Sequence, residues 1–281
     1  MTDLDIPGAI VGISVPGKID YLKPLGTSDK TTNKPMSLDD HVRIGSLTKS
    51  FTGTAILQLV DKKLVSLDDP ISKYIAGAPS GEKITLKLMG EMRSGLFSYS
   101  ADEDFVKSLF TEPPKGPDAA VFTPQQLVDI AFKHPLNFEP GTDFEYSNTN
   151  TVLLGMVIEK VAGQPLGEYL EKNIFEPLGL TKTNYPSNGD MPAPFSHGCT
   201  NQTLDESEAD SALWNPSWGN AAGAIVSTYA DVKVWANDLA KGSLLTPATQ
   251  KARIESMKQS GPGSGYGFAM FDLHGWIGHN G

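Results

Sequence analysis

Ser46 and Lys49 are the first residues in the chain whose types and spacing suggest catalysis. They begin and end the stretch Ser46-Leu47-Thr48-Lys49, at the start of a long segment without proline. Residues three apart on a helix lie on one face, so the lysine amine can reach the serine hydroxyl. The partial positive charge of a helix N-terminus would also stabilise a developing alkoxide. The pattern is short, however, and a capping serine beside a solvated lysine explains it equally well.

Tyr146 and Asn148 form a second candidate pair. They stand two residues apart in FEPGTDFEYSN, just before a predicted helix that starts at Thr149. Residues i and i+2 of an extended segment point to the same side, so both side chains could face one cleft. The alternative is a core tyrosine and a capping asparagine. A third candidate group is His279-Asn280-Gly281, in the stretch GWIGHNG.

The composition limits the classes of function. The chain has 281 residues, of which 39% are hydrophobic and 20% charged, so it can bury a large core. A net charge of -10 argues against a nucleic-acid partner, because phosphate binding requires clustered Lys and Arg. The single cysteine, Cys199, cannot form an internal disulfide and is interpreted as a small filler. No signal peptide or membrane span is predicted, so we expect a soluble bacterial protein, periplasmic, secreted or cytoplasmic.

The pattern of elements predicts strands at both ends and helices between them. A hairpin is expected from Ala9–Val15 and Ile19–Leu25 around Pro16-Gly17-Lys18, and strand again from Gly265. We expect these distant strands to share a sheet, which gives a sheet domain of residues 1–45 and 229–281 and a mostly helical domain of residues 46–228. Residues 196–217 should form an irregular surface segment. The predicted helices are Ser46–Lys63, Thr123–His134 with a capping box, Thr149–Val161 ending at Gly163, Pro165–Phe175, Tyr229–Ala240, and one from Thr246.

The three candidate groups together resemble the motifs of the penicillin-recognising serine hydrolases. The Y-x-N and H-x-G forms are most similar to class C β-lactamases, D-alanyl-D-alanine carboxypeptidases, D-aminopeptidases, D-amino-acid amidases and β-lactamase-like esterases. The similarity spans nearly the whole chain, including PGAIVGISVPGK, HVRIGSLTKSFTGTAI and PGTDFEYSNTNTVLLGMVIEKVAGQPL. It implies an α/β fold of the β-lactamase/transpeptidase type: an antiparallel sheet flanked by helices, a mostly helical lobe, and an active site between them.

The resemblance also implies a role for each catalytic residue. Ser46 would be the nucleophile that forms an acyl-enzyme, and Lys49 would help to remove its proton. Tyr146 would be the general base and acid, kept acidic by neighbouring cationic or donor groups. Whether Lys49 or Tyr146 takes the first proton stays open.

Four further residues would bind substrate. Asn148 would donate to the amide carbonyl of the substrate, and His279 and Gly281 would line the far side of the cleft. His279 would touch Tyr146 or a polar substrate group. Trp218 either covers the pocket or is a core aromatic residue.

Two departures from the family pattern bear on the substrate. Where the carboxypeptidases carry arginines for a substrate carboxylate, this chain has the apolar stretch Phe268-Ala269-Met270-Phe271. An apolar side of the cleft favours an uncharged amide or ester, since an unpaired buried carboxylate is costly. Met92 stands where many relatives have histidine, and is interpreted as structural.

The predicted function is therefore that of a serine hydrolase acting through an acyl-enzyme, without metal or organic cofactor. The substrate is expected to be a small peptide, amide or ester. D-amino-acid peptides or amides rank first, followed by small esters and β-lactams. A penicillin-binding-like scaffold without turnover is the non-enzymatic alternative.

The resemblance implies more sheet than these residues supply. In the family, two strands and a helix follow the H-x-G strand, and the backbone N–H directly after the glycine helps to bind the oxyanion. We therefore expect a C-terminal fragment or a second chain to complete the sheet and the site.

Overall fold

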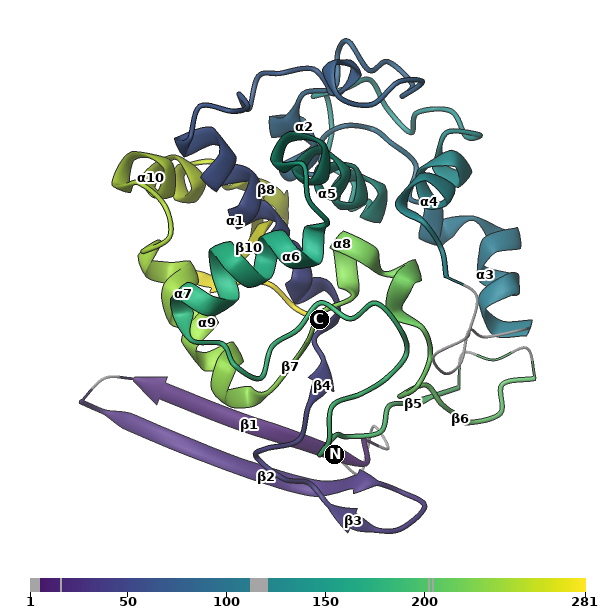
Figure 1. Cartoon of the computed structure of the whole chain (residues 1–281), viewed down its shortest axis with the longest axis vertical. Helices are drawn as coiled ribbons and strands as arrows, with labels where there is room; N and C mark the ends of the chain where they lie inside the picture. The colour runs from purple at the N-terminus through teal and green to yellow at the C-terminus, as the bar shows by residue number, and fades with distance from the viewer. Residues whose placement is uncertain (1–5, 16, 112–120, 202, 204) are drawn as a thin grey trace.

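A three-stranded antiparallel sheet begins the fold. The computed structural model describes residues 6–15, 17–111, 121–201, 203 and 205–281. Strand β1 (Gly8–Val15) pairs with β2 (Ile19–Asp29) from Gly8 opposite Gly26 to Val15 opposite Ile19, and β3 (Lys34–Pro35) follows. The predicted hairpin is confirmed, although Pro16 of its expected turn lies outside the described residues. Figure 1 shows this sheet along one side of the helical body.

The helical body is centred on α1 (Thr48–Asp61) and α5 (Asn148–Ala162), which pack against each other. A 3-10 turn, Gly45–Leu47, leads into α1. Gly163 ends α5 in the left-handed conformation, as predicted, because glycine adopts a positive φ without strain. The other helices are α2 (Leu86–Gly90), α3 (Glu103–Thr111), α4 (Pro124–Ala131), α6 (Leu166–Leu170), α7 (Glu176–Leu178), α8 (Asn220–Gly223), α9 (Tyr229–Lys241) and α10 (Pro247–Glu255).

Two details of the helices match or refine the sequence prediction. The capping box at the start of α4 is present, with Thr123 and Gln126 bonding to each other's backbone N–H. The helix expected over Pro165–Phe175 is α6 followed by a π-helical turn at Glu171–Phe175.

A second antiparallel sheet follows the helices. It contains β8 (Lys258–Gly261), β9 (Ser264–Gly267), β10 (Met270–Leu273) and β11 (Trp276–Gly278), in the order β11-β10-β9-β8. Among the described residues this sheet and β1–β3 are separate, so the single sheet expected to contain both sets of strands is not seen. The outer edge of β11 has no partner strand in this part of the chain. The proposed domain boundaries stay a prediction.

Short strand pairs complete the architecture. β4 (Val42–Arg43) pairs with β7 (Val226–Ser227) and so joins segments far apart in the sequence, next to the turn that precedes α1. β5 (Cys199–Thr200) pairs with β6 (Ala209–Asp210) inside the mostly irregular segment 196–217. None of the helices within the described ranges has both the length and the apolar character that crossing a bilayer requires.

Candidate active site

Ser46 and Lys49 lie in direct contact. Ser46 is in the 3-10 turn and Lys49 in the first turn of α1, so the serine precedes the α-helix that the sequence placed it in. Lys49 is fully buried, and its Nζ donates to Ser46 Oγ and to the Ala222 carbonyl oxygen, both at 2.8 Å. Burial lowers the pKa of Lys49 to about 7. Near neutral pH, much of this lysine is therefore the free amine, which can accept a proton.

Polar side chains of α1 hold the segment that carries the Ala222 carbonyl. Thr48 Oγ1 accepts a hydrogen bond from the Ile225 N–H at 3.2 Å, and Thr52 Oγ1 donates to the Ala221 carbonyl at 2.8 Å. Both threonines are fully buried. Because buried backbone groups need partners, these residues fix α8 against α1 and keep the lysine in place.

Tyr146 faces the same point from the loop before α5. Lys49 Nζ lies 4.9 Å from the centroid of its ring. Burial raises the pKa of Tyr146 to about 12, and a hydrogen bond with Ser46 lowers it only in part. The expectation that neighbouring groups keep this phenol acidic was wrong, because the low polarity of the site outweighs its single hydrogen bond. Tyr146 therefore keeps its proton at neutral pH.

Tyr146 belongs to a cluster of four aromatic rings with Tyr266, Phe271 and His279. Its ring centroid lies 6.1 Å from each of the other three, and Tyr266 and Phe271 meet edge to face at 4.6 Å. Sequence reasoning missed Tyr266, which is fully buried on β9. The only local signal was a tyrosine between two glycines, Gly265 and Gly267, because its place opposite Phe271 depends on the pairing of β9 with β10.

Asn148 starts α5 and already has protein partners. Its Nδ2 donates to Ser100 Oγ at 2.8 Å, and its backbone N–H donates to Ser98 Oγ at 3.1 Å. An asparagine amide has two N–H groups, so the second one remains available for a substrate carbonyl. The Ser100 hydroxyl thus sets the direction in which this amide points, and Ser98 holds the backbone at the start of α5.

His279 and Gly281 come close to the serine from the C-terminal sheet. The His279 ring contacts that of Tyr146, with centroids 6.1 Å apart, and its Nε2 is 3.2 Å from Tyr266 Oη. A Cβ on Gly281 would lie 2.3 Å from the Ile44 carbonyl oxygen, so only glycine fits beside the turn that carries Ser46. Gly45 in that turn has a φ of +49°, which glycine tolerates.

Trp218 lies at the edge of a neighbouring cavity. Its side chain is 36% exposed, and its carbonyl accepts a hydrogen bond from Tyr99 Oη at 2.6 Å. The cavity measures about 550 Å³. Its lining is mainly apolar and includes Ser100, the partner of Asn148, together with Val106, Leu109, Thr200, Ser211, Trp214 and Trp218.

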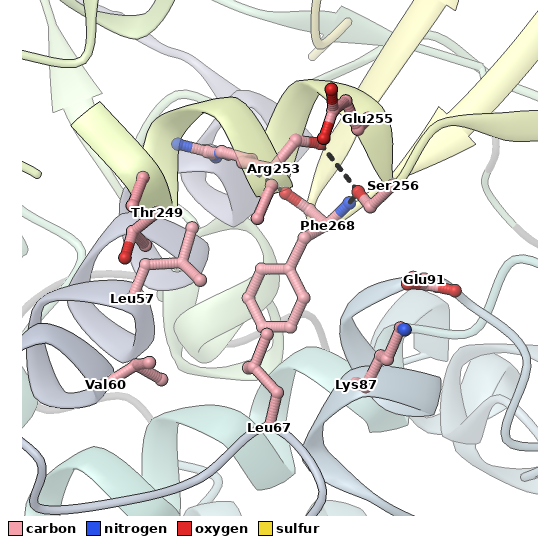
Figure 2. A pocket seen from close by; sticks show the side chains of 12 residues that line it. Leu57, Val60, Leu67, Lys87, Glu91, Thr249, Arg253, Glu255, Ser256 and Phe268 are labelled. Atoms are coloured by element: carbon pink, nitrogen blue, oxygen red, sulfur yellow. Dashed lines mark hydrogen bonds between the residues drawn. The ribbon is translucent and has the colours of Figure 1, made fainter. Parts of the chain in front are cut away.

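Most of the apolar stretch expected to line the cleft belongs to the core. Phe268, Ala269 and Met270 are buried, and Phe271 alone among the four contacts Tyr146. Figure 2 shows the Phe268 ring between Leu67 and α10, in a different cavity of about 460 Å³. The prediction that this whole stretch forms one side of the cleft was therefore wrong. Successive residues here turn away from the site into the interior.

Met92 has the structural role that the sequence suggested. It is buried against α5, where its sulfur accepts a hydrogen bond of 3.4 Å from Asn150 Nδ2. No cluster of three or more His, Cys, Asp or Glu side chains that could hold a metal ion occurs within the described residues. The prediction about cofactors is not tested by this observation.

Comparison with known proteins agrees with the geometry. The model of a family described as Beta-lactamase matches residues 1–281. A D-stereospecific amidohydrolase from Streptomyces sp. superposes with a TM-score of 0.86 and 31% identity, over 98% of this chain and 82% of the other. The D-amino acid amidase from Ochrobactrum anthropi SV3, in complex with D-phenylalanine, gives 0.85 and 28%, over 99% and 81%.

Curated sequences match over a shorter range. Protein flp from Staphylococcus aureus (strain MRSA252) is 31% identical over 191 residues, which are 65% of this chain and 36% of that protein. The chain thus spans little more than a third of the length of this relative.

Proposed function

Because the chain belongs to the beta-lactamase family of serine hydrolases, we propose that it hydrolyses amides of D-amino acids that carry an apolar side chain. The observation that carries this proposal is the contact of 2.8 Å between the buried Lys49 Nζ and Ser46 Oγ. A lysine with a pKa of about 7 is a competent proton acceptor at neutral pH. Ser46 can therefore become a nucleophile without a histidine or a metal ion.

The lowered pKa of Lys49 and the raised pKa of Tyr146 support Lys49 as the first base and Tyr146 as the proton donor. The free amine of Lys49 takes the proton of Ser46, whose oxygen attacks the amide carbonyl. Tyr146 is protonated at neutral pH and lies beside Ser46, so its hydroxyl can give a proton to the departing amine. The proton held by Lys49 then restores Tyr146. Water hydrolyses the resulting ester by the same groups in reverse.

The surroundings of the serine support an uncharged, apolar substrate. Asn148 supplies an N–H for a carbonyl beside the reacting bond, and its partner Ser100 lines the cavity of about 550 Å³ near Trp214 and Trp218. An aromatic or branched side chain suits such a lining. One of the two solved relatives is described as a D-stereospecific amidohydrolase, and the other as a D-amino acid amidase in complex with D-phenylalanine.

Ammonia release from D-phenylalaninamide and L-phenylalaninamide tests the proposal. We expect turnover of the D-enantiomer that Ser46→Ala abolishes. The matched control Ser72→Ala, in the 3-10 turn Ile71–Lys73, should retain full activity. No Ser46-dependent release from D-amino-acid amides would refute the substrate assignment. Faster Ser46-dependent hydrolysis of p-nitrophenyl acetate or of a β-lactam would instead identify an esterase or a β-lactamase.

A further inference from the structure

Both ring nitrogens of His279 have partners within the protein. Nδ1 lies 2.7 Å from the Asn280 carbonyl oxygen, and Nε2 lies 3.2 Å from Tyr266 Oη. A carbonyl oxygen can only accept, so Nδ1 must carry the hydrogen. In the neutral ring Nε2 is then the acceptor, and the Tyr266 hydroxyl must donate to it. These two contacts select one tautomer of the histidine.

The charges around His279 favour its neutral form. The pKa of His279 is lowered to about 4, mainly by burial; the hydrogen bond to the Asn280 carbonyl partly opposes this, and the positive charges of Arg253 and of protonated Lys49 add smaller lowering effects. The other titratable groups that face it are the phenols of Tyr146 and Tyr266. Burial raises the pKa of both, so neither supplies a negative charge near neutral pH.

Tyr266 is placed so that its hydroxyl always donates. The residue is fully buried, and its ring contacts Phe144 at 5.7 Å, Phe271 at 4.6 Å and His279 at 5.9 Å. Packing on several sides fixes the direction of the ring, and the raised pKa keeps the proton on its oxygen. The donor therefore does not change with pH across the neutral range.

The far end of this hydrogen-bonded chain lies beside the nucleophile. The Nδ1–H of His279 holds the Asn280 carbonyl, and the next residue, Gly281, packs on the Ile44 carbonyl and on Gly45. Ser46 follows directly. A displacement of the histidine ring would thus move the backbone that closes the site next to the serine.

We propose that Tyr266 is a positioning residue for hydrolysis, which holds His279 as a neutral Nδ1–H ring that fixes residues 279–281 against the Ser46 turn. In this role His279 neither gains nor gives up a proton during the reaction, and its ring does not bind a polar substrate group, since both nitrogens are already engaged. The inference rests on the proposed function only for its effect on rate. The state of the histidine ring can be measured independently of any substrate.

Nitrogen-15 NMR of the full chain tests the tautomer, with His279→Asn used to assign the signal. We expect Nδ1 of His279 to be protonated and Nε2 to be unprotonated, and we expect the ring not to titrate between about pH 5.5 and 9. In Tyr266→Phe the ring loses its donor, so the His279 pKa should rise toward the ordinary value of 6.5. The control Tyr169→Phe removes another buried tyrosine hydroxyl, which bonds Gln58 at 3.3 Å, and should leave the His279 signals unchanged.

Kinetics of the same variants test the positioning role. Tyr266→Phe should lower kcat/KM about 10-fold, because a buried acceptor is left without its donor, and should add an acid limb to the pH profile. Tyr169→Phe should change neither. His279→Asn places its amide N–H near the position of Nδ1, whereas His279→Gln reaches toward Nε2, so the asparagine variant should be the more active.

Three results would overturn the proposal: a protonated Nε2 in the wild type, an unchanged spectrum and pH profile in Tyr266→Phe, or a glutamine variant more active than the asparagine variant. A wild-type chain with no Ser46-dependent turnover would refute the proposed function and with it the effect on rate. The nitrogen-15 signals would still show which ring nitrogen of His279 is protonated. A failure of the proposed function can therefore be distinguished from a failure of the proposed hydrogen bonds.

Discussion

The two sides of the candidate site are built from different interactions. On the lysine side, Lys49 is held by hydrogen bonds to Ser46 and to the Ala222 carbonyl. On the aromatic side, Tyr146 is held mainly by rings, those of Tyr266, Phe271 and His279. Burial acts on both sides but in opposite directions. It removes the proton from a cation on the lysine side and retains the proton of a phenol on the aromatic side.

This difference divides the proton chemistry between the two sides. A group whose pKa is lowered to about 7 can accept a proton at neutral pH, whereas one whose pKa is raised to about 12 still holds a proton that a departing amine can take. The same low polarity therefore produces a base and an acid from residues that would both be protonated in water. Substitutions on each side should separate the two functions.

The largest effect is expected from Lys49→Met. This variant keeps a long side chain in the buried position but has no amine, so kcat should fall by about 10²–10⁴, the usual contribution of a general base. The measurement is ammonia release under saturating substrate. Lys62→Met, at the exposed end of the same helix, is the matched control and should keep wild-type kcat. Substantial activity in Lys49→Met would show that Lys49 is not the base and would point to Tyr146 instead.

A smaller loss is expected from Tyr146→Phe. The phenylalanine ring keeps the packing against Phe271, so the thermal midpoint should stay close to that of the wild type. Without the hydroxyl the departing amine lacks its proton donor, and kcat on amides should fall by about 10². Esters with good leaving groups need no such proton, so p-nitrophenyl acetate hydrolysis should fall much less. Equal losses on both substrates would contradict an acid role.

The pH dependence of the wild-type enzyme tests the role of Lys49 as base without any substitution. Ser46 is activated only by the free amine of Lys49, so kcat/KM should rise with pH through about 7 and then level off. Stability should follow the same group. Its pKa is 10.5 in the unfolded chain and about 7 when folded, so the unfolded state binds more protons between these values. The free energy of unfolding contributed by Lys49 therefore increases as pH rises across that window.

The sequence predicted which candidate residues lie near one another better than it predicted how the strands pair. The proximity within each pair, Ser46 with Lys49 and Tyr146 with Asn148, followed from local spacing at a helix start. The resemblance to a known family, not the spacing, predicted that the two pairs meet. The helices themselves followed from apolar periodicity and from local signals such as the Thr123 capping box and Gly163. These features depend on neighbours within a few residues.

Features that depend on distant contacts could not be predicted in the same way. Tyr266 acquires its place only when β9 pairs with β10, and Phe268 turns into the core only because helices α1 and α10 leave a cavity there. The pKa of Tyr146 was misjudged for the same reason. Its value is set by the burial of the whole site, which a list of polar neighbours does not give.

The smallest effects should come from residues that support each side without touching substrate. Thr52→Val removes the donor to the Ala221 carbonyl, and Phe271→Leu removes a ring beside Tyr146. Each should lower the free energy of unfolding by about 1–3 kcal/mol, from a buried group left unpaired or from lost aromatic packing.

Their kinetic effects should differ. Thr52→Val loosens the Ala221 carbonyl and with it the neighbouring Ala222 carbonyl that orients Lys49, so it should lower kcat a few-fold with little change in KM. Phe271→Leu loosens the surface that faces the substrate, so it should mainly raise KM. If both variants change the same constant, the lysine side and the aromatic side act as one unit. Such coupling would show as non-additive unfolding free energies in the double variant, because sites without shared partners combine additively.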